Sequence, residues 1–408
     1  MSDRVVLGFS GGLDTSVAVL WLKEEYGLDV ITVTVDVGQN EDLRAVERRS
    51  RELGAIRHYN IDAKDEFVRG YVHKAIKANA LYEGEYPLGT ALARPLIAKK
   101  LVDIAHKEGA IAVSHGCTGK GNDQVRFEVT IKALDPTLRI IAPMREWNLT
   151  RDKEVEYAMK RGFYFEASKS QFSVDQNIWG RSIEGGILED PSKEPPEEAF
   201  EWTVAATNAP NEPGYMTLTF EGGVPVRVNG EELQPVELIT FVNRFAGQHG
   251  VGRIDHIEDR LVGIKSREVY EYPAALTIIE AHRDLEKMVL TRHQLFFKRR
   301  VEEEWAWLVY SGLWVDPLRE DLDAFIDSTQ RYVEGEVTIK LYKGSYRVVS
   351  RKSRYSLYSH DLATYTKDST FQQSSATGFI ELWGLPSRLA YRNKPFQAEK
   401  VEAARRRV

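Results

Sequence analysis

The feature that most constrains the fold lies near the start of the chain, where an apolar run, a glycine-containing turn and a helical pattern follow one another. Residues 5–9 predict a strand, and residues 10–16 read SGGLDTS. A strand that leads through such a turn into a helix points several backbone N–H groups and the positive end of the helix dipole at one spot. Gly11 and Gly12 allow positive φ values and close ligand approach, and the serine and threonine side chains add hydroxyl donors. We predict that the turn binds phosphate.

The turn differs from the common nucleotide P-loop. It lacks the lysine of G-x-x-x-x-G-K-[ST], and residues 10–16 carry no positive charge. A loop without that lysine suits a departing pyrophosphate better than the transfer of a γ-phosphoryl group. SGGLDTS resembles the signature of the ATP pyrophosphatase superfamily, whose members cleave ATP between the α and β phosphates and adenylate a substrate. The alternative is a ligand-free connection from strand to helix that Asp14 caps.

The composition predicts a folded, soluble protein that binds neither nucleic acid nor a membrane. A chain of 408 residues, 42% of them apolar, is long enough for two domains. The net charge of -6 argues against a nucleic-acid surface, and no apolar run approaches the roughly 18 residues of a membrane helix. We expect no signal peptide ahead of the first strand. The single Cys117 excludes an intramolecular disulfide, so we expect a reducing cytoplasm.

Strand patterns and helical patterns alternate from residue 4 to residue 165. The predicted strands are residues 5–9, 29–36, 56–61, 110–115 and 138–142, and the predicted helices include residues 41–53, 91–108 and 151–161. This alternation predicts a doubly wound α/β domain with a mostly parallel sheet. Ligands bind at the carboxyl ends of such strands. We therefore expect the loops at residues 10–16, 35–39 and 114–123 to share one rim of the sheet.

Beyond residue 165 the composition changes, and predicted strand hairpins mix with long helices. Hairpins are predicted over residues 216–228 and 336–351, a helix begins at Pro235, and residues 274–307 form a strongly helical run. Residues 189–197 are typical of an exposed linker. We divide the chain into a nucleotide-binding domain of residues 1–165, an α+β domain of residues 166–380 and a C-terminal helical extension of residues 381–408.

A second polar loop, residues 114–126, follows a predicted strand and contains three glycines. Asn122 and Asp123 can bond an ammonium or amide group, Thr118 can donate to a carboxylate, and Arg126 can hold a carboxylate in a bidentate fork. These side chains suit the binding of amino acids. The alternative is a loop in which Asn122 or Asp123 only caps the next helix, and we expect capping in either case.

With these motifs, the whole chain resembles the argininosuccinate synthase family, which joins citrulline to aspartate at the expense of ATP. The resemblance rests on SGGLDTS at 10–16, YPLGTALARP at 86–95, SHGCTGKGNDQVRFE at 114–128, and GVGRID at 250–255 leading through Glu258 to KSREVY at 265–270. It extends over nearly all residues of the chain. SGGLDTS alone would indicate only the superfamily.

The resemblance implies the residues of three binding sites. For ATP these are Gly8, Phe9, Ser10, Gly11, Gly12, Leu13, Asp14, Thr15, Ser16, the backbone of Val35, and Gly116. For aspartate they are Thr118, Asn122 and Asp123. For citrulline they are Tyr86, Thr90, Ala91, Asn122, Arg126, Ser173, Ser182, Glu258 and Tyr270. Some relatives carry serine where this chain has Ala91, so only a backbone contact is expected there. Asp14, Thr15, Ser16 and Asp123 are assigned as catalytic.

The implied reaction begins when the ureido oxygen of citrulline attacks the α-phosphorus of ATP and pyrophosphate leaves. The aspartate amine then displaces AMP. No protein nucleophile is required, so catalysis would rest on positioning and on stabilising phosphate charge. Mg²⁺ is expected with the phosphates, and both Asp14 and Asp123 are candidate contacts. The family further implies arginine biosynthesis and a homotetramer, in which the basic extension with Arg405, Arg406 and Arg407 packs on neighbouring subunits.

Other functions fit the sequence less well. A tRNA-thiolating relative generally uses paired cysteines and a basic surface, and a glutamine-using relative needs a glutaminase domain or partner. A noncatalytic ATP sensor would not need two amino-acid sites. We interpret His115 as a hydrogen-bonded histidine at a strand end and Cys117 as a small loop residue. The tryptophans are assigned to core or subunit packing; they are Trp305, Trp307 and Trp314.

Overall fold

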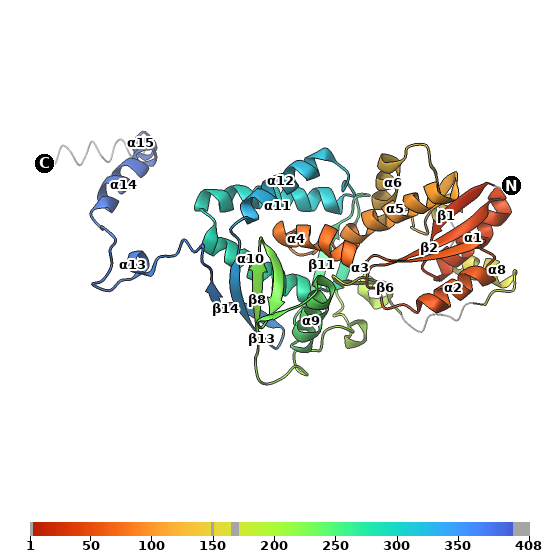
Figure 1. The fold of residues 1–408 in the computed structure, drawn as a ribbon, viewed down its shortest axis with the longest axis horizontal. Coiled ribbons are helices and arrows are strands. Elements are labelled where there is room, and N and C mark those ends of the chain that lie inside the picture. The colour runs from red at the N-terminus through yellow and green to blue at the C-terminus, as the bar shows by residue number, and fades with distance from the viewer. Residues whose placement is uncertain (1–2, 148–150, 165–170, 395–408) are drawn as a thin grey trace. The chain divides into compact units, whose positions relative to one another are not determined.

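A computed structural model of the chain describes residues 3–147, 151–164 and 171–394 (Figure 1). The chain divides into two compact units between Tyr355 and Ser356. Within the described residues, no helix combines the length and the apolar character that crossing a bilayer requires. The domain boundary predicted at residues 165 and 166 lies outside the described residues, and the boundary at 380 and 381 stays a prediction.

The first part of the larger unit is built on a parallel five-stranded sheet in the order β3-β2-β1-β4-β5. Its strands are β1 (Arg4–Gly8), β2 (Asp29–Asp36), β3 (Arg57–Asp62), β4 (Ala112–Ser114) and β5 (Arg139–Ile141). The helices are α1 (Leu13–Tyr26), α2 (Leu43–Glu52), α3 (Lys64–Phe67), α4 (His73–Lys77), α5 (Gly89–Glu108), α6 (Asp123–Leu134), α7 (Pro143–Trp147) and α8 (Arg151–Met159). A π-helical turn, η1 (Val68–Val72), joins α3 to α4.

Both faces of this sheet are covered. Val5 and Leu7 pack into one apolar cluster with residues of α1, whereas Val6 faces a second cluster that contains residues of α5. This alternation along β1 confirms the predicted doubly wound α/β domain. The chain builds β2 and β3 on one side of β1 and then crosses to the other side to build β4 and β5, and ligands bind at such a switch point. The turn after β1 and the loop after β4 both begin there.

The second part of the unit contains an antiparallel five-stranded sheet in the order β10-β9-β8-β13-β14. Its strands are β8 (Gly214–Glu221), β9 (Val224–Val228), β10 (Glu231–Glu232), β13 (Gly335–Tyr342) and β14 (Ser345–Lys352). Both predicted hairpins are therefore confirmed. The helices beside it are α9 (Pro235–Gln248), α10 (Pro273–Val289), α11 (Arg292–Tyr310) and α12 (Pro317–Gln330).

The long helical run predicted over residues 274–307 is two helices rather than one. The break falls between Val289 and Arg292, where Thr291 caps α11. The Thr291 hydroxyl accepts from the backbone N–H of Gln294 at 3.3 Å, and the Gln294 side chain accepts from the Thr291 N–H at 3.0 Å. This reciprocal capping box satisfies N–H groups that a new helix leaves open. The apolar spacing continues across the break and hides it in the sequence.

A third sheet, which the sequence did not predict, joins the two parts of the unit. It has the order β11-β12-β7-β6, with strands β6 (Ser173–Gln176), β7 (Arg181–Glu184), β11 (Arg253–Asp259) and β12 (Lys265–Glu271). The buried Glu271 carboxylate supports it by accepting from Arg181 Nη1 at 2.8 Å and from the Thr203 N–H at 2.8 Å. The linker predicted over residues 189–197 runs between two short 3₁₀ turns, η2 (Gly186–Glu189) and η3 (Glu197–Ala199).

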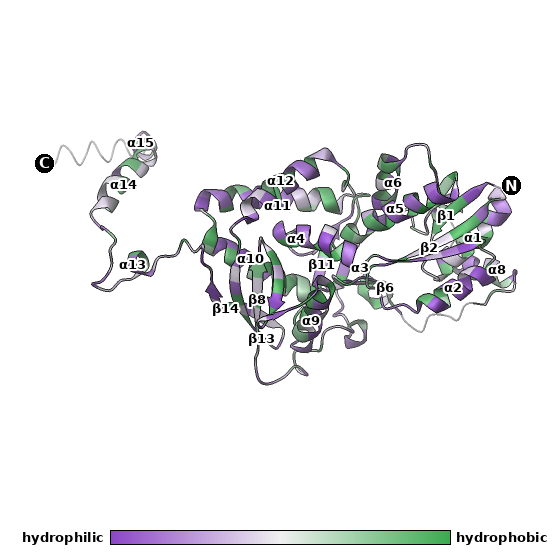
Figure 2. Cartoon of the chain, in the orientation of Figure 1, coloured by the Kyte–Doolittle hydropathy of each residue, from purple (hydrophilic) through white to green (hydrophobic). Residues whose placement is uncertain are grey.

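The described residues of the second compact unit, 356–394, contain the helices α13 (His360–Ala363), α14 (Ser375–Trp383) and α15 (Leu385–Arg392). None of their residues is buried, although α14 is the more apolar stretch in Figure 2. Its exposed side chains include Phe379, Ile380, Leu382 and Trp383. The predicted helical extension is thus seen as far as Arg392. Arg405, Arg406 and Arg407 lie outside the described residues.

Candidate active site

A cavity of about 950 Å³ lies where the carboxyl ends of β1, β2 and β4 meet the third sheet. All but two of the residues assigned from the sequence line it. They are Gly8, Phe9, Ser10, Gly11, Gly12, Leu13, Asp14, Thr15, Val35, Tyr86, Thr90, Gly116, Thr118, Asn122, Asp123, Arg126, Ser173, Ser182, Glu258 and Tyr270. The exceptions are Ser16 and Ala91, which are buried beneath the cavity wall.

The turn after β1 places the N-terminus of α1 at one end of the cavity. The helix begins at Leu13, and the N–H groups of a first helical turn have no acceptor within the helix. Gly11 has a φ of +76°, as expected, but Gly12 is extended with a φ of -71°, so only one glycine needs its conformational freedom. The Ser10 hydroxyl accepts from the Gly12 N–H at 3.3 Å. No side chain caps α1, so the alternative of an Asp14 cap is wrong.

A positive charge does lie beside this turn, although it comes from another element. Arg49 of α2 lines the cavity and donates from Nη1 to the Gly11 carbonyl at 2.6 Å. The loop after β4 closes the other side, where a side chain on Gly116 would lie 2.9 Å from Thr15 Cγ2. The sequence indicated the turn and missed Arg49, because nothing local links α2 to residues 10–16.

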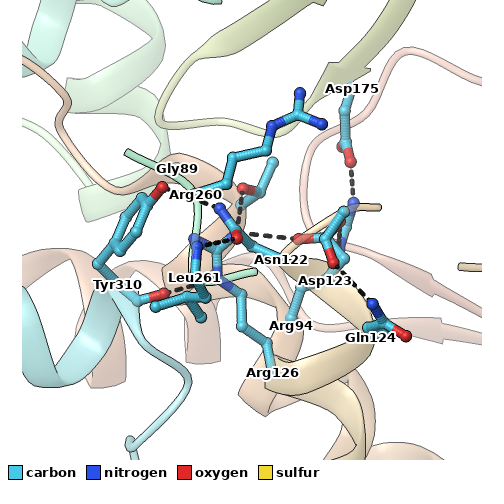
Figure 3. A network of polar contacts seen from close by, with 12 residues as sticks. Gly89, Arg94, Asn122, Asp123, Gln124, Arg126, Asp175, Arg260, Leu261 and Tyr310 are labelled. Atoms are coloured by element: carbon cyan, nitrogen blue, oxygen red, sulfur yellow. Dashed lines mark hydrogen bonds and ion pairs between the residues drawn. The ribbon is translucent and has the colours of Figure 1, made fainter. Parts of the chain in front are cut away.

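At the middle of the cavity, Asn122 connects the two parts of the unit (Figure 3). Its Nδ2 donates to the Tyr310 hydroxyl at 2.9 Å, and its Oδ1 accepts from the Leu261 N–H at 2.9 Å. The side chain makes no capping bond to α6, so the expected cap is wrong. Tyr310 and Leu261, both distant in sequence, bind the Asn122 side chain in place of the backbone N–H groups of α6.

Asp123 lies between two arginines, and Figure 3 shows the group. Arg94 Nε is 2.7 Å from Asp123 Oδ2, and Arg126 Nη1 is 2.9 Å from Asp123 Oδ1. Burial alone would raise the pKa of the Asp123 carboxyl, but the charges of Arg94 and Arg126 outweigh it and lower that pKa. Arg94 also pairs with Asp175 of β6, and thereby ties α5 to the third sheet. The sequence analysis assigned no role to Arg94 or to Asp175.

Arg126 is 3% exposed, and two of its three guanidinium nitrogens donate hydrogen bonds. Its Nη1 also donates to Thr90 Oγ1 at 3.0 Å, and its Nε donates to the Tyr310 carbonyl at 3.1 Å. Among the described residues, the buried Nη2 has no hydrogen-bond partner. A buried donor that is left open costs free energy unless a ligand accepts from it.

A tyrosine pair and a carboxylate complete this end of the cavity. The rings of Tyr86 and Tyr270 stack with their centroids 4.7 Å apart, and the Tyr86 hydroxyl is 2.9 Å from Thr90 Oγ1. The Tyr270 hydroxyl donates to Glu258 Oε2 at 2.6 Å. Burial, followed by the Glu258 charge, raises the pKa of Tyr270 well above its usual value. The phenol therefore remains a donor at neutral pH.

The remaining assigned residues lie at the rim. Ser173 and Ser182 stand on neighbouring strands β6 and β7, Thr118 is exposed, and the Val35 carbonyl accepts from Gln39 Nε2 at 2.9 Å. Charged side chains that the sequence did not assign share this rim: Glu184, Arg260 and Glu268. Arg260 Nη2 is 2.7 Å from Glu268 Oε1 and 2.8 Å from Glu184 Oε2.

Of the residues set aside in the sequence, His115 and Cys117 line the cavity, Trp305 is packed in the core, and Trp307 is 46% exposed, so that its place in subunit packing stays a prediction. His115 Nδ1 accepts from the Cys117 N–H at 3.3 Å, and its Nε2 is 3.2 Å from Glu128 Oε1. Desolvation, followed by the Asp123 charge, raises the pKa of the Cys117 thiol, which keeps it a poor nucleophile. Trp305 is buried and donates to Asp323 Oδ1 at 2.7 Å.

Comparison with known families matches residues 4–164 to the arginosuccinate synthase N-terminal HUP domain and residues 172–390 to the arginosuccinate synthase C-terminal domain. An argininosuccinate synthase of Pyrococcus furiosus is 61% identical over 388 residues, which cover 95% of this chain and 94% of the relative. Those of Dehalococcoides mccartyi and Pyrobaculum aerophilum are 57% and 54% identical, over 98% and 96% of this chain and 99% of each relative. This chain belongs to the argininosuccinate synthase family.

Proposed function

We propose that the protein ligates citrulline and aspartate to argininosuccinate, consuming ATP and releasing AMP and pyrophosphate, as a step of arginine biosynthesis. The observation that carries the proposal is one cavity lined both by the turn of residues 10–16 and by the polar side chains that we assign to two amino acids. The family membership of the chain supports the same reaction.

We assign the ATP phosphates to the turn of residues 10–16 and to the Gly116 loop. The N–H groups at the start of α1 and the hydroxyls of Ser10 and Thr15 are the donors, and Arg49 supplies the positive charge that the turn lacks. Ser16 is assigned a smaller part than the sequence gave it, because its N–H donates to the Gly12 carbonyl at 3.0 Å.

Citrulline is assigned to the wall formed by Tyr86, Thr90, Arg126, Glu258 and Tyr270. The open Nη2 of Arg126 suits its carboxylate, and the Glu258 carboxylate suits its ammonium group. Aspartate is assigned to Thr118, Asn122 and Asp123 beside it. Asn122 stands between the two amino acids, as the resemblance implied.

The proposed chemistry needs no protein nucleophile. The ureido oxygen of citrulline attacks the α-phosphorus of ATP, and the bond to the pyrophosphate oxygen breaks. The aspartate amine then attacks the activated ureido carbon, the carbon–oxygen bond breaks and AMP leaves. The protein contributes by holding the three substrates in reacting positions and by placing donors around the phosphates.

Asp14 fits Mg²⁺ better than Asp123 does. Both Asp123 oxygens are already paired with arginines, whereas Asp14 lines the cavity within the phosphate turn. Mg²⁺ is typically held by one or two carboxylates together with substrate phosphates. Among the described residues, no group of three acidic, histidine or cysteine side chains could hold a metal alone. We therefore assign Asp14 to Mg²⁺, which would neutralise phosphate charge when bound.

The test of this function is a product assay. The purified protein is incubated with Mg-ATP and with citrulline and aspartate, together and singly. We expect AMP, pyrophosphate and argininosuccinate in equal amounts only when both amino acids are present. Formation of ADP and phosphate, or turnover that does not depend on citrulline, would contradict the proposal.

We also propose a cytoplasmic homotetramer in which the second compact unit packs on other subunits. The exposed apolar side chains of α14 support this, because soluble proteins seldom leave such a group uncovered. Deleting residues 375–408 removes α14 and α15 and is expected to convert the tetramer to smaller species. Mass measured by light scattering checks the result, and a tetramer that survives the deletion would rule out this role.

A further inference from the structure

Tyr310 lies at the C-terminal end of α11, far in sequence from every residue assigned to the cavity. We propose that Tyr310 is a positioning residue of the citrulline site, whose hydroxyl fixes the carboxylate of Glu258 and the amide of Asn122. The inference rests on the proposed function. Tyr310 does not line the cavity, so it acts through its neighbours rather than on substrate.

The Tyr310 hydroxyl sets the direction of the Glu258 carboxylate. It donates to Glu258 Oε1 at 2.6 Å, while the Tyr270 hydroxyl donates to Glu258 Oε2 at 2.6 Å. Each carboxylate oxygen therefore has its own phenol donor, and the plane of the carboxylate is fixed. The remaining lone pairs stay available to a cation in the cavity.

The same hydroxyl orients Asn122. Asn122 Nδ2 donates one hydrogen to Tyr310 at 2.9 Å, and Oδ1 accepts from the Leu261 N–H at 2.9 Å. A side-chain amide has two N–H hydrogens, so one remains for a ligand. The Leu261 N–H can only donate, and the Tyr310 hydroxyl accepts from the amide because its own hydrogen goes to Glu258. A flipped amide would therefore lose the bond to Leu261 and could bond Tyr310 only if the hydroxyl gave up Glu258.

The backbone carbonyl and the ring of Tyr310 hold Arg126 in place. The Tyr310 carbonyl accepts from Arg126 Nε at 3.1 Å, and the guanidinium carbon lies 5.0 Å from the centre of the Tyr310 ring. Burial, followed by the Glu258 charge, raises the pKa of Tyr310, so its hydroxyl keeps its proton at neutral pH. One tyrosine thus contacts three residues assigned to citrulline.

Tyr82 provides a matched control. Its ring stacks on that of Tyr310 with 3.5 Å between centroids, and its hydroxyl donates to the Asp259 carbonyl at 2.9 Å. The Tyr310 hydroxyl also lies 3.0 Å from this carbonyl. Within the described residues, the Tyr82 hydroxyl is hydrogen-bonded to neither Glu258 nor Asn122. Tyr82→Phe therefore removes a phenol hydroxyl from the same aromatic stack and leaves both orienting bonds in place.

The test compares wild type, Tyr310→Phe and Tyr82→Phe in the product assay. For Tyr310→Phe we expect a rise of about 10- to 100-fold in KM for citrulline, because hydrogen bonds to a charged group are lost. KM for ATP should stay within about twofold of wild type, as should every constant of Tyr82→Phe. A purely structural role would not raise KM for citrulline while leaving KM for ATP unchanged. Equal constants for the two variants, or a uniform loss of kcat alone, would overturn the inference.

A double-mutant cycle with Glu258→Gln gives a second test. If Tyr310 acts through Glu258, adding Tyr310→Phe to Glu258→Gln should raise KM for citrulline by much less than it does alone. Strictly multiplicative effects would overturn the coupling, and failure of Tyr310→Phe to fold would favour a structural role instead. Wild-type protein without citrulline-dependent turnover would refute the proposed function itself, before any variant is compared.

Discussion

Asp123→Ala should abolish argininosuccinate formation while leaving citrulline-dependent exchange of pyrophosphate into ATP largely in place. The exchange reports the first step, in which citrulline is adenylated, and that step needs no aspartate. Asp123 pairs with Arg94 and Arg126, and its lowered pKa keeps it charged at neutral pH. We expect kcat/KM for aspartate to fall by more than about 100-fold, since truncating one partner of a buried charge pair is costly.

Both steps are measured on the same preparation, and the fold is checked by circular dichroism. Asp135→Ala is the control: Asp135 follows the C-terminus of the same helix, bonds to Thr137 and His106, and does not line the cavity. It should behave as wild type. Near wild-type ligation by Asp123→Ala would refute the aspartate role, and equal loss of exchange and ligation would place Asp123 at the citrulline site.

Much of the first sheet could be predicted because three of its strands, β1, β2 and β4, are buried on both faces. Such strands read as continuous apolar runs, and β2 was predicted over the residues it occupies, 29–36. The third sheet was not predicted, because β6 and β7 have four residues each and contain serine, arginine and charged residues. Their place in the sheet depends on the pairing of β7 with the distant β12, in which Ser182 lies opposite Tyr270. Short polar strands of this kind become recognisable only after folding has brought them together.

The residues of the site also fall into those that the sequence predicted and those that it missed. Residues 10–16 and 114–126 form loops whose chemistry is local, and their positions around one cavity were expected because each follows a strand of the predicted parallel sheet. Arg49 and Arg94 were missed because each acts across a tertiary contact. The error at Asn122 has the same origin: its residue type favours a local cap, but the Leu261 N–H and the Tyr310 hydroxyl bind it instead. Local chemistry indicates which side chains are available, and the fold decides which partners they take.

Arg126→Lys should impair both steps, in contrast to Asp123→Ala. The guanidinium bonds to Tyr310, Thr90 and Asp123 at once, and its Nη2 is buried and open among the described residues. Lysine carries a point charge on a flexible stem and cannot present this planar set of donors. The citrulline carboxylate would then lose the Nη2 donor, the one guanidinium nitrogen that is not already bonded within the described part of the chain, so the fork expected from the sequence is not available to it. We expect kcat/KM for citrulline to fall by more than about 100-fold in exchange and in ligation alike.

Arg145→Lys is the matched control for that variant, because Arg145 Nη1 pairs with Glu128 at 2.6 Å and does not line the cavity. It should leave both steps within about threefold of wild type, as expected for an arginine in a partly exposed pair. If Arg126→Lys lost ligation and kept exchange, Arg126 would belong to the aspartate site rather than to citrulline. Since Asp123 and Arg126 are bonded neighbours on one helix, only different effects on the two steps can show that they serve different substrates.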